Sequence, residues 1–190
     1  MSKIETNTIA PSTGTTLTLG ESGDTVQVGT GVTATGFGAN TPAFKAYISS
    51  GQSISNTTMT KVTFQTEMYD TDNAYDNSTN YRFTPQEAGK YFVYASIYLD
   101  AGTNTNLDRC YSYIYKNSTQ VFFNVFDPRA NSGRGFSTNP SGIISLNGST
   151  DYVEVKSLIV GTSNAFSLVV YGGTGNNASF SYFGAYKIIE

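Results

Sequence analysis

The sequence has no histidine and only one cysteine, Cys110. Without an imidazole it cannot build a serine or cysteine triad with a histidine base, a histidine metal ligand or a histidine pH switch. A single thiol excludes a disulfide within the chain and a zinc site made of thiolates. These absences exclude the most common catalytic routes, and we expect that the protein is not an enzyme.

Charge is also scarce: 11 basic and 14 acidic residues give a net charge of −3, and charged residues make up 13% of the chain. So few cations argue against nucleic acid and against an anionic membrane surface as partners. The sequence has no apolar run long enough to insert into a membrane. The opening residues MSKIETNT lack the apolar segment of a secretory signal, so none is expected.

Glycine (19), tyrosine (14) and phenylalanine (12) are abundant instead, and apolar residues alternate with polar ones between turn-forming clusters. This pattern predicts an all-β protein, an antiparallel sandwich or barrel. The expected strands are 43–49, 59–65, 89–99, 109–116, 119–126, 141–146, 151–160, 166–171 and 179–189.

The composition changes near residues 36–42, which divides the chain into a leader, 1–42, and a head, 43–190. In the leader, Thr-Leu-Thr-Leu-Gly at 16–20 is echoed by Thr-Val-Gln-Val-Gly at 25–29 and more loosely at 32–36. Such short β repeats gain a core by stacking or by winding around other chains, which favours a fibrous shaft. The alternative interpretation is a disordered Thr/Gly-rich leader.

The expected strands are of two types: some have one apolar face, and others have two. Val62 and Phe64 share one face of their strand, and Val153 and Val155 share one face of theirs, while Glu154 and Lys156 point the other way, as on a solvent-facing sheet. By contrast, segments 91–99 and 180–186 carry large apolar side chains on both faces. Because exposed aromatic surface is costly, we expect a partner subunit to cover the second face, although tyrosines also tolerate half-exposure. The predicted interface residues are Phe92, Tyr94, Tyr98, Phe180, Tyr182 and Tyr186.

The head resembles the globular head of the complement C1q and tumour necrosis factor superfamily. The resemblance rests on Phe64, Asp70, Tyr75, Phe83, the stretch Thr-Pro-Gln-Glu-Ala-Gly-Lys-Tyr at 84–91 and the closing Tyr-Phe-Gly-Ala-Tyr-Lys-Ile at 182–188. It implies a jelly-roll β-sandwich that forms homotrimers with its first and last strands in the inner sheet. Segment 166–171 departs from the family pattern as an extra strand or insertion.

The leader is similar to leader and shaft segments of tailed-bacteriophage fibre proteins, notably those of marine phages. This resemblance implies a structural protein on the surface of the phage particle, a tail or capsid fibre. Residues 1–42 would anchor in other virion proteins, and the head would mediate attachment to a host surface glycan or protein. The alternative is a decoration protein that stabilises the capsid or tail without binding a receptor.

Two groups of side chains are candidate ligand sites. Asp70, Asp72 and Asp76 have the oxygen ligands that Ca²⁺ prefers, and heads of the related family can bind Ca²⁺. The favoured interpretation of these aspartates is nevertheless a solvated Asx-rich turn. No other cofactor is expected. Three connections are expected to meet at the distal tip, where amides and arginines can bind sugars or carboxylates. The candidate receptor-binding residues are Asn104, Asn106, Asp108, Arg129, Asn131, Arg134, Asn176 and Asn177.

Overall fold

The computed structural model describes residues 8–27, 29–30, 40–100, 107–127, 135–161, 167–170 and 180–189, of which 167–170 are described by their backbone alone. The chain divides into two compact units, 1–37 and 38–190. Within the described residues, no helix is long and apolar enough to cross a membrane. All described strands belong to the second unit.

The leader residues 8–27 and 29–30 form turns and irregular backbone, so the short strand expected at 16–20 is not formed, and the described residues of 25–29 are not in a strand either. A turn at Gly20–Asp24 is closed by the Asp24 side chain, which accepts a hydrogen bond from the Glu21 N–H at 2.8 Å. Leu19 and Val26 are 58% and 63% exposed. A single copy offers these segments no neighbouring strand, so their backbone groups have no ladder to join. The third repeat, 32–36, lies outside the described residues.

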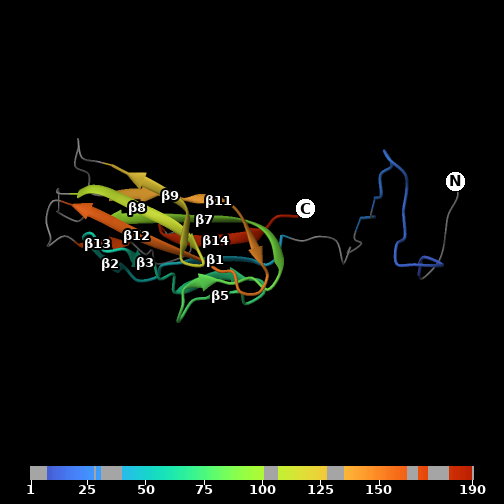
Figure 1. The fold of residues 1–190 in the computed structure, drawn as a ribbon, viewed down its shortest axis with the longest axis horizontal. Helices are drawn as coiled ribbons and strands as arrows, with labels where there is room; N and C mark the ends of the chain where they lie inside the picture. The colour runs from blue at the N-terminus through green and yellow to red at the C-terminus, as the bar shows by residue number, and fades with distance from the viewer. Residues whose placement is uncertain are drawn as a thin grey trace. The chain divides into compact units, whose positions relative to one another are not determined.

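The described residues of the second unit form fourteen strands, which run mostly along the long direction of that unit (Figure 1). They are β1 Ala43–Tyr47, β2 Gln52–Ser55, β3 Thr60–Lys61, β4 Thr66–Asp70, β5 Tyr75–Asp76, β6 Arg82–Phe83, β7 Ala88–Asp100, β8 Leu107–Lys116, β9 Thr119–Phe126, β10 Gly135–Thr138, β11 Ser141–Asn147, β12 Val153–Gly161, β13 Ser167–Val170 and β14 Tyr182–Lys187.

These strands form two antiparallel sheets. The eight-stranded sheet has the order β2-β13-β7-β14-β1-β4, with β10 and β11 also paired to β7. The six-stranded sheet has the order β5-β6-β12-β8-β9, with β3 paired to β12. The first and last strands, β1 and β14, are neighbours in the first sheet, as the family resemblance implies.

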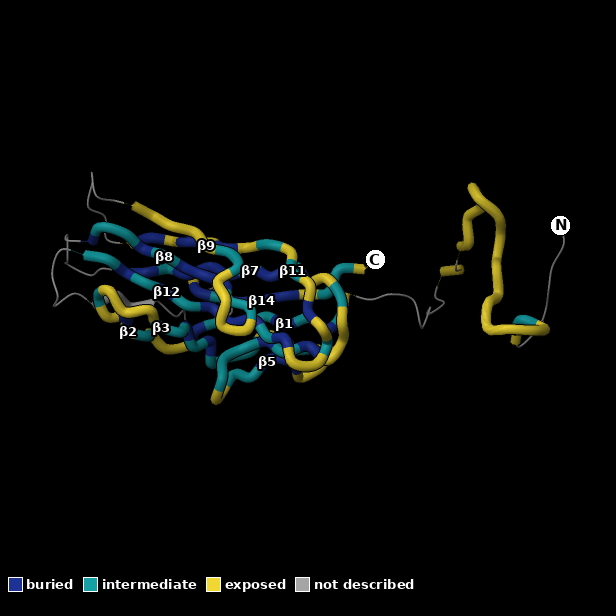
Figure 2. The backbone as a smooth tube through the Cα atoms, viewed as in Figure 1, coloured by how far each residue is buried: buried dark blue, intermediate teal, exposed yellow. Residues whose placement is uncertain are grey.

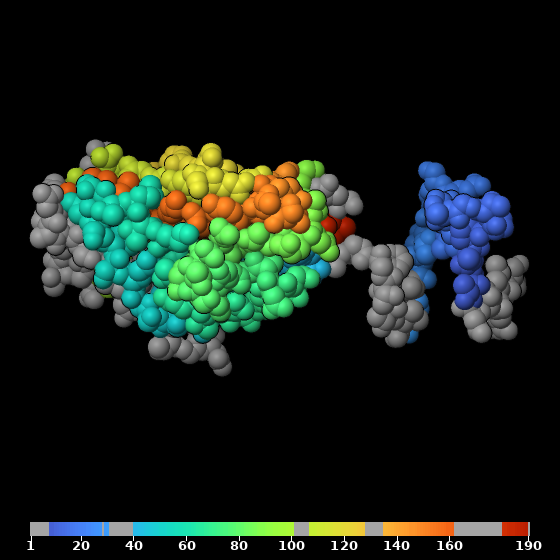
Figure 3. Space-filling model, turned by 60° about the horizontal axis from the view of Figure 1, so that its bottom comes forward, coloured from blue at the N-terminus to red at the C-terminus, as the bar shows by residue number. Residues whose placement is uncertain are grey.

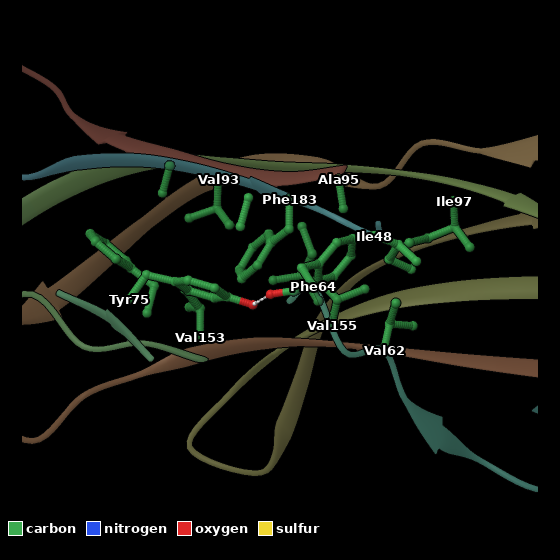
Figure 4. Packing of buried hydrophobic residues seen from close by; sticks show 14 of the residues in the cluster. Ile48, Val62, Phe64, Tyr75, Val93, Ala95, Ile97, Val153, Val155 and Phe183 are labelled. Carbon is green, nitrogen blue, oxygen red and sulfur yellow. Dashed lines mark hydrogen bonds between the residues drawn. The ribbon is translucent and has the colours of Figure 1, made fainter. Parts of the chain in front are cut away.

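The core between the sheets is dominated by aromatic rings. Phe44, fully buried, stacks on Tyr75 and on Phe83, each at 4.6 Å between ring centroids, and meets Phe183 edge-on at 4.9 Å. The Tyr75 hydroxyl donates a 3.1 Å hydrogen bond to the Phe64 carbonyl, drawn as the dashed line in Figure 4. Burial raises the pKa of Tyr75, so its hydroxyl stays neutral.

Each of the nine segments expected to be strands overlaps one in the structure, and the extra segment at 166–171 is β13, which pairs with β2 and β7. The sequence did not indicate β2, β4, β5, β6 or β10. These strands have two to five residues, too few to show a clear alternation. Of these, β2, β4 and β5 lie at the edges of the two sheets, β6 joins β5 to β12, and β10 pairs with β7.

Glu154 corrects one expectation. It points away from the core as predicted, but it is only 4% exposed rather than solvated. Its carboxylate contacts the Nζ of Lys61 at 2.6 Å and the Nζ of Lys156 at 3.1 Å. Lys61 reaches it from β3, which the sequence pattern merged into a longer strand. A buried carboxylate requires such partners, because an unpaired buried charge is strongly destabilising.

Candidate functional site

The alternation of β7 assigns its side chains to two faces. Tyr91, Val93, Ile97 and Leu99 are fully buried in the core, whereas the intervening aromatic side chains point to the opposite side of the sheet and are partly exposed. The neighbouring strand β14 repeats the pattern, with Phe183 fully buried. In Figure 2 the buried segments of β7 and β14 lie inside the second unit.

The rings on this opposite side touch one another. Phe92 lies 5.6 Å from Tyr186 and 5.9 Å from Tyr94, measured between ring centroids. Tyr94 in turn lies 6.2 Å from Tyr182. Tyr98 and Phe180 form a further pair at 5.2 Å. We call these six residues the aromatic face: Phe92, Tyr94, Tyr98, Phe180, Tyr182 and Tyr186.

A glycine makes room for the centre of this face. Gly184 lies opposite Tyr94 in the β14–β7 ladder, and a Cβ atom there would come within 2.5 Å of the Tyr94 ring. The Tyr94 ring can therefore lie over the backbone of β14. Beside it, the Lys45 ammonium of β1 lies 4.5 Å from the centroid of the Tyr182 ring, a cation–π contact.

Much of the aromatic face remains open to solvent in the single chain: Phe180 is 52% exposed and Tyr186 is 37% exposed. Two further exposed side chains that the sequence did not indicate adjoin the aromatic face, Tyr69 of β4 (46% exposed) and Ile143 of β11 (58% exposed). Ile143 pairs with Phe92, and Tyr69 pairs with Lys45 of β1. The pKa of Tyr94 is raised mainly by burial of its hydroxyl and, to a smaller extent, by a hydrogen bond with Tyr69.

Of the eight candidate receptor-binding residues, the structure describes only Asp108, which is half-buried as the second residue of β8. The other seven are Asn104, Asn106, Arg129, Asn131, Arg134, Asn176 and Asn177, and they lie outside the described residues. The ends of the strands on either side of these residues do pair with one another. Asp100 pairs with both Gly135 and Val169, and Leu107 pairs with Gly161.

The aspartates proposed for Ca²⁺ serve as turn formers. The Asp76 carboxylate accepts three backbone N–H hydrogen bonds of 2.9 to 3.0 Å from residues 78–80, which hold its pKa well below the usual range. Asp70 accepts a 2.8 Å hydrogen bond from the Tyr75 N–H. Among the residues that the structure describes, no three acidic or thiol side chains, Asp72 included, come together to hold a metal ion. These contacts agree with the Asx-rich turn.

Comparison with known proteins identifies the fold of the second unit. No protein-family model matches the sequence, and no curated protein matches it either. Among solved structures, murine APRIL at pH 5.0 is similar with a TM-score of 0.53 and 12% identity, covering 77% of this chain and 98% of that one. The Eiger TNF protein from S. frugiperda has a TM-score of 0.54 and 12% identity, covering 77% of this chain and 91% of that one. Residues of the second unit therefore have the jelly-roll sandwich fold of the tumour necrosis factor proteins.

Proposed function

We propose that this protein is a structural and adhesive homotrimer that acts without catalysis: a phage fibre whose head contacts the host surface. The observation that carries the proposal is the aromatic face, which the single chain leaves partly open. It consists of one group of four touching rings and one pair, Tyr98 with Phe180. Contiguous exposed apolar surface of this kind marks an interaction site, and further copies of the same chain are the simplest cover for it.

The position of the face within its sheet supports this role. Together with Tyr69 and Ile143 it spans β11, β7, β14, β1 and β4, so it extends across the whole width of this part of the sheet. Lys45 and Gly184 do not interrupt the rings, because the Lys45 ammonium lies over Tyr182 in a cation–π contact and Gly184 carries no side chain. A neighbouring copy that covers the face would cover this ammonium against the Tyr182 ring.

The two ends of the head suit a fibre. The leader enters at Ala43, which pairs with Tyr186 and thereby lies near Phe92 at the beginning of β7. The candidate receptor loops are flanked by strand ends at Asp100, where β7 ends. Eight residues of strand separate these points, about 26 Å at ~3.3 Å per residue. This separation supports the proposal that the leader, 1–42, anchors the protein in the particle. The candidate receptor-binding residues would then belong to the end of the head opposite Ala43.

Light scattering of the full chain tests the assembly, and we expect the mass of three copies. Binding of the purified protein to host cells tests attachment, and alanine substitutions at Asn104, Arg129 and Asn176 should weaken it. A stable monomer would contradict the trimer. Loss of particle stability without any cell binding would instead favour the decoration protein.

A further inference from the structure

A second row of tyrosines lies on the outer side of the six-stranded sheet. Along β8, Cys110, Ser112 and Ile114 are fully buried toward the core, so the intervening residues point the other way. These intervening residues are Arg109, Tyr111, Tyr113 and Tyr115, which we call the tyrosine strip. Arg109 and Tyr115 are separated by six residue steps, about 20 Å along the strand.

The rings of the strip form a connected surface. Tyr111 and Tyr113 lie 5.8 Å apart between centroids with their planes 9° from parallel, and Tyr115 lies 6.2 Å beyond Tyr113. From β9, Phe123 lies 6.1 Å from Tyr113 and is itself 55% exposed. Tyr113 is therefore fixed by its neighbours, while Tyr111, Tyr115 and Phe123 remain accessible. In Figure 3 the atoms of residues 107–127, in yellow, lie directly beside those of residues 135–161, in orange.

Cations border both ends of the strip. At one end the Lys156 ammonium of β12 lies 4.3 Å from the centroid of the Tyr115 ring. At the other end, Arg109 pairs with Val160 of β12, and its buried Nε has no hydrogen-bond acceptor within the described part of the chain. Arg109 as a whole is half-buried, so its terminal guanidinium nitrogens, and not the buried Nε, are the donors left for a carboxylate.

Two acidic groups of this sheet are already engaged. Glu154 is buried between Lys61 and Lys156, and Asp76 caps its own turn. Because one carboxylate serves two lysines, one lysine charge and the charge of Arg109 remain near the strip. The strip belongs to the opposite sheet from the aromatic face, so assembly through that face leaves it open.

We infer that the tyrosine strip binds an acidic carbohydrate chain, one that carries carboxylates on its sugar rings. The C–H faces of sugar rings pack on aromatic side chains, and the tyrosine hydroxyls can exchange hydrogen bonds with sugar hydroxyls. Arg109 would bind a sugar carboxylate through paired hydrogen bonds. This inference names the ligand class for the proposed attachment role and places it on the side of the head rather than on the distal loops.

Calorimetric titration of the full chain with a short oligogalacturonate tests the inference. We expect binding, and we expect the fully methyl-esterified oligomer, which keeps the rings and loses the charges, to bind at least about tenfold more weakly. Arg109→Gln and Tyr111→Leu should each weaken binding by about tenfold or more. Arg82→Gln is the matched control, since it removes an arginine over a tyrosine ring, that of Tyr152, outside both the strip and the aromatic face, and it should bind like the parent.

Four results would overturn the inference: no binding of oligogalacturonate, equal binding of the esterified oligomer, equal binding of polyglutamate, or unchanged binding by both variants. Equal binding of polyglutamate would mean that only charge is recognised. If Tyr111→Leu does not fold, the titration of Arg109→Gln with oligogalacturonate still tests the inference. The assembly proposal fails separately, because light scattering measures mass without any carbohydrate. A change of mass caused by Tyr111→Leu would make the strip an interface between copies instead.

Discussion

Replacing Tyr186 with serine removes one ring from the aromatic face without entering the core. Tyr186 is 37% exposed, and its ring lies 5.6 Å from that of Phe92. A buried aromatic side chain covers roughly 200 Å², so roughly 75 Å² of Tyr186 is available to a neighbouring copy. At about 25 cal/mol per Å², this area contributes about 2 kcal/mol per contact. We therefore expect Tyr186→Ser to weaken each subunit contact by about 25-fold.

Sedimentation equilibrium of the full chain over a range of concentrations measures this loss. Tyr186→Phe keeps the ring and should associate like the parent. Met59→Ser also removes exposed apolar surface, from a residue that is 40% exposed before β3, and should leave association unchanged. If Tyr186→Ser associates as tightly as the parent, the aromatic face is not the interface. If the parent is monomeric at every concentration, the assembly itself is refuted.

Four further predictions concern single positions. Glu154→Gln should cost about 2 kcal/mol in the free energy of unfolding measured with urea, because it weakens the charged contacts of a buried carboxylate with two partly exposed lysines, and a loss below about 0.5 kcal/mol would contradict this. Burial raises the pKa of Cys110 to about 12, so a thiol reagent should label it only after unfolding, and rapid labelling of the folded chain would argue against the packing. Hydrogen bonds from a lysine and an asparagine side chain lower the pKa of Asp151 below 3.8. Its carboxylate therefore contributes stability above about pH 4 that is lost as the pH falls, and Asp151→Asn should flatten this acid-induced decline. Gly184→Ala should displace the ring of Tyr94 and weaken association, which sedimentation would detect, while unchanged association would show that the ring has room to move.

The aromatic face was largely predictable because a strand places alternate residues on opposite sides. Phe92 and Tyr94 could be assigned to one side of β7, and Tyr182 and Tyr186 to one side of β14, from their spacing alone. Tyr69 could not be added, since β4 has no clear alternation and its register against β1 shifts between Lys45 and Ala46. Only the paired strands show which side of the sheet Tyr69 occupies.

The tyrosine strip, too, was predictable only in part. The spacing of Tyr111, Tyr113 and Tyr115 within one expected strand places them on one side, yet it does not tell whether cations lie nearby. Lys156 pairs with Tyr113 only because β12 and β8 are neighbours in the sheet. Arg109 similarly acquires its position at the end of the strip from the register between these strands.

The sequence by itself determined the all-β class, the two-sided strands and the exclusion of histidine and disulfide chemistry. It did so because composition and period-two alternation are properties of the chain that need no knowledge of distant contacts. The tertiary structure alone decided which faces adjoin and which charges are paired. Glu154 is the clearest example: alternation placed it in water, whereas a lysine 93 positions earlier (154 − 61) joins it in a buried ion pair. Strand order and register depend on such long-range contacts, which no local pattern encodes.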